Sequence, residues 1–211
     1  MPPQVHTSTH PLVLAKLSAL RATSTRPAEF RALVRSLATL LGAEATADLA
    51  TAAITVETPM GAATCSRLAD TVGIVPILRA GLGMADAMLE LIPEAEVWHL
   101  GIFRDERTLQ PWEYYNKLPK RCGVTLALIV DPMLATGGSA ARACEVVRAW
   151  GVRRVKVVAL IAAPEGIARL SSAFPDVPIH VGAIDERLNE VGYIVPGLGD
   201  AGDRQFGTRP D

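Results

Sequence analysis

The sequence has few of the features that mark secreted or membrane-spanning proteins. Its only cysteines are Cys65, Cys122 and Cys144, so neither a disulfide framework nor a CxxC metal site fits. Its apolar runs, such as "VVALIAA", are far shorter than the roughly 20 residues that span a membrane. No basic segment followed by an apolar one stands near the N-terminus, so no secretory signal is expected. These absences predict a soluble, cytoplasmic protein without a membrane partner.

An excess of charge of either sign is also missing. The chain has 21 basic and 22 acidic residues, which give a net charge of −1. A nucleic-acid-binding domain usually carries a basic patch or stripe, and none is visible here. We therefore expect no nucleic-acid partner, and any anionic ligand must be held by local groups.

Length and composition fit one globular domain. Of the 211 residues, 49% are hydrophobic and 20% are charged, an ordinary balance for a folded chain. A chain of this length can bury roughly 70–75% of the surface that it exposes when unfolded. We expect a single domain over residues 1–211, with a core at about 50–175 and a small C-terminal hood at about 176–211.

Short apolar runs alternate with helical patterns along the chain. Apolar residues from Phe30 to Leu41 recur at helical spacing and predict an amphipathic N-terminal helix that begins near Pro27. Strands are expected at 73–78, 96–103, 123–130 and 154–161, and helices at 83–92 and 139–150, the latter ending at Gly151. This alternation predicts an α/β fold, with a central, mostly parallel sheet flanked by helices and an N-terminal helical segment.

Residues 104–121, "RDERTLQPWEYYNKLPKR", interrupt this alternation because they are polar and aromatic without apolar periodicity. A connection of this length inside a compact domain is usually functional or mobile. We expect a lid over a binding site, with Tyr114 and Tyr115 as covering aromatic side chains. A surface hairpin or a dimer contact is the alternative.

Charged residues follow three of the expected strands. Arg79 follows "GIVPIL", Arg104 follows "EVWHLGIF", and Asp131 follows "VTLALIV". The carboxyl ends of parallel strands meet at one edge of a sheet, where ligands bind. Guanidinium groups suit phosphate oxygens, and a carboxylate accepts hydrogen bonds from hydroxyls. The three residues predict a ligand that carries both anionic and hydroxyl groups.

The loop "ATGGS" at residues 135–139 lies between an expected strand and an expected helix. Its successive backbone N–H groups at a helix N-terminus, with the hydroxyls of Thr136 and Ser139, suit a phosphate group. The alternative is a plain strand-to-helix turn in which Ser139 is the N-cap.

Other nucleotide and catalytic motifs do not fit. No GxxxxGK[ST] motif occurs, which disfavours a P-loop. "GLGDAG" at 197–202 matches GxGxxG, but the nine residues after Gly202 are too few for the required βαβ unit. The four histidines are scattered without HExxH spacing, and no nucleophile–base pair is visible.

With these segments identified, the sequence resembles the type I phosphoribosyltransferases, and among them the uracil branch. The resemblance is carried by "ILRAGLGM", "FRDE", "DPMLATGGSA" and "GYIVPGLGDAGDR", and it extends from about His10 to Thr208. The wider superfamily usually has two adjacent acids where this chain has Asp131 and Pro132, which favours the uracil branch over the purine types. The resemblance implies an enzyme that transfers the 5-phosphoribosyl group from 5-phosphoribosyl 1-diphosphate (PRPP) to uracil, giving UMP and pyrophosphate, with Mg²⁺.

The resemblance also implies roles for individual residues. Asp131 would meet the ribose hydroxyls, and Arg79 and Arg104 would face the pyrophosphate; these three are the expected catalytic residues. No side chain is assigned as a direct metal ligand, although Asp200 would lie near PRPP and its metal. The expected PRPP-binding residues are Arg79, Arg104, Asp131, Pro132, Met133, Leu134, Ala135, Thr136, Gly137, Gly138, Ser139 and Asp200, and the expected uracil-binding residues are Ile194, Gly199, Asp200 and Ala201.

The resemblance and the amphipathic N-terminal helix suggest a homodimer or a larger homo-oligomer, and GTP is a candidate activator on which the sequence is silent. Two other functions stay open. One is a regulator on the same fold that senses PRPP or UMP and binds RNA, although the balanced charge disfavours it. The other is a phosphoribosyltransferase that acts on a different base.

Overall fold

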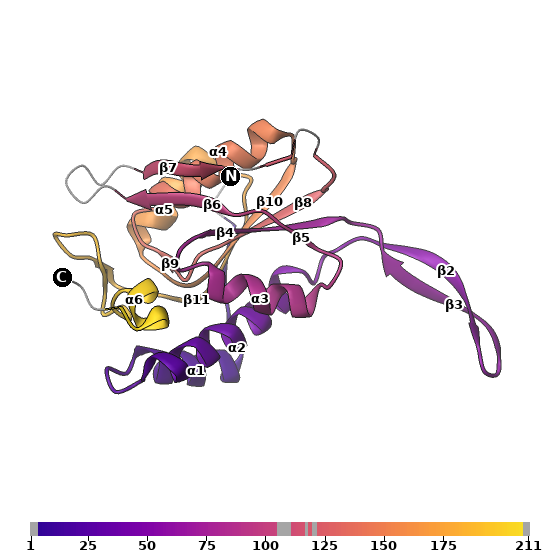
Figure 1. The fold of residues 1–211 in the computed structure, drawn as a ribbon, viewed down its shortest axis with the longest axis horizontal. Coiled ribbons are helices and arrows are strands. Elements are labelled where there is room, and N and C mark those ends of the chain that lie inside the picture. The colour runs from indigo at the N-terminus through magenta and orange to yellow at the C-terminus, as the bar shows by residue number, and fades with distance from the viewer. Residues whose placement is uncertain (1–3, 105–110, 117, 120–121, 209–211) are drawn as a thin grey trace.

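The computed structural model describes residues 4–104, 111–116, 118–119 and 122–208, with the side chains of all of these except 103, 104, 111 and 112. Figure 1 shows a central sheet with helices on both of its faces. The α/β architecture expected from the sequence is therefore confirmed.

The central sheet has nine strands in the described part of the chain. They are β1 (Val5–Thr7), β4 (Val72–Leu78), β5 (Glu96–Val97), β6 (Leu100–Arg104), β7 (Pro111–Asn116), β8 (Leu126–Val130), β9 (Met133–Leu134), β10 (Arg154–Ala162) and β11 (Ile179–Ile184). The order across the sheet is β1-β11-β10-β8-β4-β6-β7, while β5 also pairs with β4 and β9 with β10. All of these pairs are parallel except β6 with β7, so the sheet is mostly parallel, as expected.

Helices cover the two faces of the sheet because its central strands are apolar on both. One face packs against α1 (Pro11–Arg21), α2 (Pro27–Ala45) and α3 (Leu82–Leu91), and the other against α4 (Gly138–Trp150) and α5 (Pro164–Ala173). Every residue of β8 is buried, and its alternate side chains enter the two separate core clusters. The predicted helices at 83–92 and 139–150 match α3 and α4, and α4 ends at Gly151 as expected.

The predicted strand at 96–103 is two strands. β5 and β6 both pair with β4, and Trp98 lies between them. The Trp98 indole packs against Gly73, where an added Cβ would come within 2.5 Å of the ring, and it meets Trp150 edge-on at 4.2 Å between ring centroids. Trp98 and His99 separate the two strands, and the side chain of Trp98 is buried in the core.

Part of the expected lid forms a strand. Residues 111–116 make β7, which pairs antiparallel with β6, so this part follows the surface-hairpin alternative. Tyr114 and Tyr115 are exposed on it. Residues 105–110, 117 and 120–121 lie outside the described residues, and closure over the site stays a prediction.

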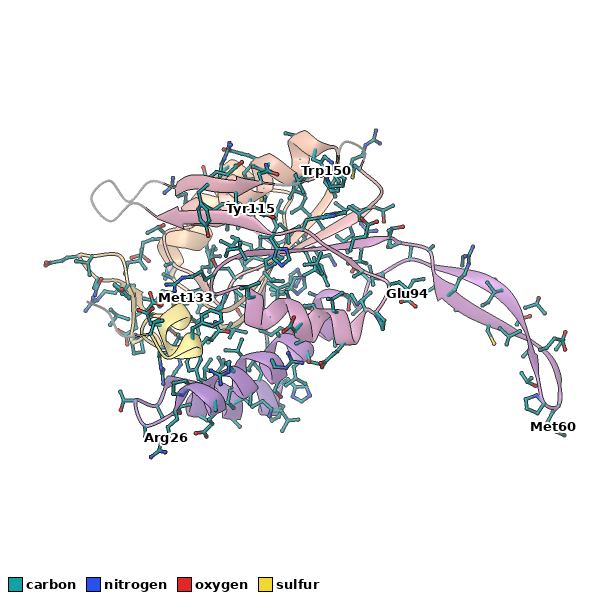
Figure 2. The ribbon with its side chains drawn as sticks, viewed as in Figure 1. Arg26, Met60, Glu94, Tyr115, Met133 and Trp150 are labelled. Atoms are coloured by element: carbon teal, nitrogen blue, oxygen red, sulfur yellow. The ribbon has the colours of Figure 1, made fainter. Side chains whose placement is uncertain are left out.

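An arm that the sequence analysis did not predict projects from the body. It consists of β2 (Thr51–Thr58) and β3 (Gly61–Leu68), which pair only as a two-stranded antiparallel hairpin. The arm points away from the body at the end opposite α6 (Ala201–Phe206), and Met60 lies at its tip (Figures 1 and 2). Most of its residues are exposed.

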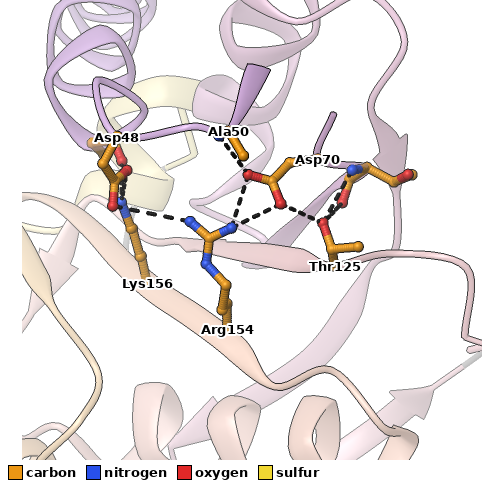
Figure 3. Close-up of polar contacts among 8 residues, drawn as sticks. Asp48, Ala50, Asp70, Thr125, Arg154 and Lys156 are labelled. Atoms are coloured by element: carbon orange, nitrogen blue, oxygen red, sulfur yellow. Dashed lines mark hydrogen bonds and ion pairs between the residues drawn. The ribbon is translucent and has the colours of Figure 1, made fainter. Parts of the chain in front are cut away.

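A polar cluster fixes the base of the arm to the sheet (Figure 3). The Asp70 carboxylate accepts hydrogen bonds from the Ala50 N–H at 2.9 Å, from the Thr125 hydroxyl at 2.8 Å and from the Arg154 guanidinium at 2.8 Å. Ala50 and Asp70 stand directly before and after the arm, so one carboxylate holds both ends of the hairpin. The Ala50 N–H is the largest cause that lowers the pKa of Asp70, which falls from 3.8 to about 2, and Arg154 and Thr125 lower it further.

The C-terminal region leaves the sheet later than the sequence suggested. β11 belongs to the central sheet, so the hood begins at Asp185 and not near residue 176. It contains β12 (Arg187–Leu188), β13 (Ile194–Val195) and α6. Among the described residues, no helix is long and apolar enough to cross a membrane.

We predict that Asp70→Ala lowers the free energy of unfolding at pH 7 by about 1–3 kcal/mol, because three donors lose their acceptor. The pKa of Asp70 is lower in the folded state, so this contribution is present above pH 3.8 and is lost as the pH falls toward 2. Denaturant unfolding at pH 7 and pH 3 measures it. Thr125→Ala, which keeps the carboxylate, is the control, and a wild-type-to-variant difference that does not shrink at pH 3 would contradict the prediction.

Candidate functional site

Two turns meet at the carboxyl end of the central strands. Arg79 to Gly81 follow β4, and Asp131 follows β8, the strand beside it. A Cβ on Gly81 would lie 2.5 Å from the Val130 carbonyl oxygen, so only glycine lets the two turns come this close. The expected convergence of Arg79 and Asp131 on one edge of the sheet is therefore seen in the structure.

The loop after β9 leads into α4 without a side-chain cap. The N-cap residue is Gly137, with a φ of 74°, and no side chain accepts a hydrogen bond from the first turn. The alternative in which Ser139 caps the helix is wrong, because Ser139 already lies inside α4. The start of the helix is thus available for an anion, as the sequence predicted.

This loop is held tightly against α5. A Cβ on Gly137 would lie 2.5 Å from the Gly166 carbonyl oxygen, and one on Gly166 would lie 2.3 Å from the Ala135 carbonyl oxygen. The Ala163 N–H also donates to the Leu134 carbonyl at 3.0 Å. The path of the loop is therefore set by packing within the protein itself.

A cavity of about 130 Å³ lies along this loop and α4. Seven of the expected PRPP-binding residues line it: Asp131, Met133, Leu134, Ala135, Thr136, Gly137 and Ser139. The hood contributes Gly192 to the same cavity. The carboxylate, the hydroxyls and the open helix start therefore face one volume, which suits a ligand with a phosphate and hydroxyl groups.

Asp131 is set apart from the other acids by its surroundings. Burial raises its pKa from 3.8 to about 7, the Met133 N–H lowers it in part, and the nearby charge of Asp200 raises it. The Met133 N–H donates to Oδ1 at 3.2 Å. The carboxyl group therefore changes its protonation close to neutral pH.

The hood helix α6 brings acids to Arg79. Asp200 is the N-cap of α6 and accepts a hydrogen bond from the Asp203 N–H at 2.9 Å. Oδ1 of Asp203 lies 3.6 Å from Nη2 of Arg79, whose side chain is 61% exposed. Asp203, to which the sequence analysis assigned no role, thus faces the basic group expected to meet pyrophosphate.

A partly buried ion pair fixes the turn between β13 and α6. Arg21 at the end of α1 donates to Oδ2 of Asp185 at 2.7 Å and to the Gly197 carbonyl at 2.8 Å. The Gly197 N–H donates to the same Oδ2 at 2.9 Å. Arg21 and Asp185 therefore hold both backbone polar groups of a turn that lies among the expected uracil-binding residues.

Arg204 makes a second connection between the hood and the N-terminal helices. Its guanidinium donates to the carbonyl oxygens of Leu20, Ala22 and Leu198, and it lies 4.5 Å over the Phe30 ring. The sequence analysis missed Arg21, Asp185 and Arg204, because residues so far apart in sequence give no local signal.

The expected uracil-binding residues lie on this fixed segment. Ile194 is in β13 and Ala201 begins α6, and both are buried, while Gly199 has a φ of 78° in the turn between them. Pro132 and Gly138 are buried and do not line the cavity. Arg104 ends β6, and its side chain lies outside the described residues.

Comparisons with known proteins agree with this geometry. A family model described as uracil phosphoribosyltransferase matches residues 7–208. A uracil phosphoribosyltransferase from Roseiflexus sp. (strain RS-1) is 58% identical over 205 residues, which cover 97% of this chain and 99% of the relative. The solved structure of the AQ2163 protein from Aquifex aeolicus matches with a TM-score of 0.93 and 39% identity, covering 98% of this chain and 100% of that one.

A more distant match shows the fold alone. A hypoxanthine phosphoribosyltransferase from Staphylococcus aureus has a TM-score of 0.52 at 13% identity, with 82% of each chain covered. The likeness to type I phosphoribosyltransferases that the sequence indicated is thus confirmed by the family model and by the fold.

The raised pKa of Asp131 predicts that PRPP binding is linked to proton release near pH 7. Ribose hydroxyls favour the ionised carboxylate, so the affinity for PRPP should fall by up to about tenfold per pH unit below pH 7. Calorimetry in two buffers of different ionisation enthalpy counts the protons released. The Asp131→Asn variant has no carboxyl proton to release at this position, whereas protons released by PRPP itself are the same for both proteins. Equal proton release by the wild type and the variant would therefore contradict the prediction.

Proposed function

The chain belongs to the uracil phosphoribosyltransferase family and transfers the 5-phosphoribosyl group of PRPP to uracil, and we propose that the reaction occurs where the Arg79 turn, Asp131 and the hood meet. The observation that carries this assignment of the site is the cavity beside the uncapped start of α4, with Asp131 at its edge. The start of α4 can bind a phosphate and Asp131 can bind ribose hydroxyls, and both line the same cavity.

PRPP has three polar parts, and the site has a matching group for each. The 5′-phosphate fits the backbone N–H groups at residues 135–139, where the helix dipole favours negative charge. The ribose hydroxyls fit Asp131. The diphosphate fits Arg79, whose exposed guanidinium is now paired only loosely with Asp203 at 3.6 Å and can exchange one anion for another.

The chemistry requires little of the protein besides position and charge. The bond between ribose C1 and the diphosphate oxygen breaks, and its electron pair leaves with pyrophosphate. Uracil N1 forms the new bond to C1, and the N1 proton passes to the departing pyrophosphate or to water. Positive charge develops on the ribose and negative charge on the leaving group. A fixed donor such as Arg79 that stabilises the developing charge is typically worth about 10²–10³ in rate, and holding both substrates in contact supplies much of the rest.

Uracil is proposed to bind along the hood between Ile194 and Ala201. The backbone groups of this segment can meet the alternating donors and acceptors of the pyrimidine edge. The segment is held by Arg21 with Asp185 and by Arg204, so it cannot easily shift to accept a different edge. Cytosine carries an amino group where uracil has a carbonyl, and the mismatch leaves buried polar groups unpaired, which can reject an analogue strongly.

Mg²⁺ is proposed as a cofactor that arrives with PRPP. The described residues contain no cluster of three or more His, Cys, Asp or Glu side chains that could hold a metal ion on their own. Mg²⁺ commonly binds through one or two carboxylates together with substrate phosphates and water, and Asp200 with Asp131 fits that pattern. When bound, the ion neutralises charge on the diphosphate.

The cellular location of the enzyme and its activation by GTP are two further proposals. The three cysteines are free thiols, which fits a reducing compartment, and we propose a cytoplasmic enzyme. Activation by GTP is a proposal supported by the family resemblance alone, and adding GTP to the assay below tests it. The homologues favour neither an RNA-binding regulator nor a transferase for another base.

The purified protein with PRPP and Mg²⁺ is expected to convert uracil to UMP and to release pyrophosphate. A panel of uracil, cytosine, orotate, adenine and hypoxanthine, followed by chromatography of the nucleotides, tests this. Cytosine should react at least about 10³-fold more slowly than uracil, since a mismatched polar group is buried. Removal of Mg²⁺ with a chelator should stop the reaction. Absence of UMP from uracil would overturn the proposed function.

The arm supports a proposal that two copies of the chain associate. An isolated two-stranded hairpin is marginally stable in water at best. One face of this arm is largely apolar, because Ile54 pairs with Cys65 and Val56 with Ala63, while Thr55 and Thr64 pair on the other face. A second copy that covers the apolar face would bury side chains that a monomer exposes, which favours a homodimer.

We predict that Ile54→Lys shifts the protein toward monomers, because it places a charge on the apolar face of the arm. Thr55→Lys, one residue along and on the opposite face, is the matched control and should keep the oligomeric state. Light scattering after size exclusion measures the mass of each protein over a range of concentrations. A monomeric wild type, or an equal effect of both variants, would refute the proposal.

A further inference from the structure

Gln205 in α6 is a buried amide between the hood and the Arg79 turn. Its residue is fully buried, in a part of the molecule where the neighbours are mostly apolar. Nε2 donates to the Ala80 carbonyl at 2.9 Å and to the Ala201 carbonyl at 3.1 Å. Both donors of the amide are therefore used. One bonds to the turn that is proposed to bind PRPP, and the other to the segment that is proposed to bind uracil.

The other atom of the same amide has no partner. Among the described residues, Oε1 of Gln205 is one of three buried side-chain polar atoms without a hydrogen bond. A buried acceptor without a donor is unfavourable for folding. The two hydrogen bonds that Nε2 donates must offset this burial, and of the two only the bond to the Ala80 carbonyl reaches outside α6.

What the amide does is hold the turn that carries Arg79. Ala80 is the next residue after Arg79. The turn is also fixed by backbone hydrogen bonds from the Gly81 N–H to the Ile77 carbonyl at 2.9 Å and from the Leu82 N–H to the Arg79 carbonyl at 3.2 Å. Gln205 therefore supplies a hydrogen bond to this turn from the hood. The same short helix carries Asp203, which faces the Arg79 guanidinium.

Gly83 provides the space that this contact requires. A Cβ on Gly83 would lie 1.9 Å from Oε1 of Gln205, closer than atoms can approach without a shift. Gly83 lies in the first turn of α3 and contacts no residue that we place against a substrate. An alanine there would push the amide away from Ala80 without removing a polar group.

We propose that Gln205 is a positioning residue for pyrophosphate: through its bond to the Ala80 carbonyl it holds Arg79 where the diphosphate of PRPP binds. The inference rests on the proposed function, because it assumes that Arg79 meets that group. It adds a residue with no contact to either substrate, and it makes α6 the physical connection between the uracil segment and the Arg79 turn.

Two variants test the role of the amide. Gln205→Met keeps the size of the side chain but removes both donors, and Gly83→Ala displaces the amide while leaving it intact. Each is expected to raise the KM for PRPP and the inhibition constant of pyrophosphate by about tenfold, because loosening one fixed donor weakens a charge-assisted contact. The KM for uracil should stay within about twofold, because Ala201, the second acceptor of the amide, is still held by α6 and the contacts of Arg204.

Thermal stability together with the kinetic constants separates this role from a purely structural one. Gln205→Met leaves the Ala80 carbonyl without its donor and Gly83→Ala crowds a buried side chain, so each should lower the Tm moderately. A change in the constants for PRPP and pyrophosphate, with the KM for uracil unchanged, is the readout that a purely structural role would not give. In a Gln205→Ala background, Gly83→Ala should have no further effect on the KM for PRPP, because the atom that it would displace is gone. The effects of the two substitutions on the KM for PRPP are non-additive if both act through the amide of Gln205.

The result that overturns the proposal is a KM for PRPP and a pyrophosphate inhibition constant within twofold of wild type in both single variants. A lower Tm with unchanged constants also overturns it, because it would show that Gln205 serves only folding. Failure of the proposed function is a different outcome, since the wild type itself would then make no UMP.

Discussion

The burial of β8 on both faces of the sheet is the constraint on which the rest of the molecule depends. All five of its residues are buried, so polar groups can stand only where the strand begins or ends. At one end, Thr125 helps to hold the arm through Asp70; at the other, Asp131 enters the site. In β10, Arg154 stands exposed at the first position, while the buried Lys156 is satisfied by the Ala45 carbonyl at 2.7 Å. The arm and the candidate site are thereby kept at opposite ends of the same strands.

Local patterns in the sequence were enough for the sheet, most helices and half of the site. Short continuous apolar runs that alternate with helical patterns favour strands buried on two faces, and residues that follow such parallel strands gather at one edge. That reasoning placed Arg79, Asp131 and the loop at 135–139 together before any contact was known. It failed at 96–103, where Trp98 turns into the core. It had also left open a turn capped by Ser139, which the structure excludes because the N-cap of α4 is Gly137.

Contacts between distant segments could not be predicted in this way. Arg21 and Asp185 are 164 residues apart in sequence, and neither stands in a motif, yet together they hold the Gly197 turn. The arm was missed for another reason. Its alternation of Ala, Ile and Val with Thr is weakly hydrophobic, because its apolar face packs against no core of its own chain. A pattern that reports burial gives little signal where most residues are exposed.

The close packing of residues 135–137 on Gly166 has a consequence for the thermodynamics of ligand recognition. A flexible phosphate-binding loop would lose conformational entropy when its ligand arrives, and part of the interaction energy would be spent on ordering it. Here the backbone is already confined by the start of α5 and by the bond from Ala163 to Leu134. The ordering has been completed during folding, so the attraction between the loop and an anion can appear almost in full as affinity.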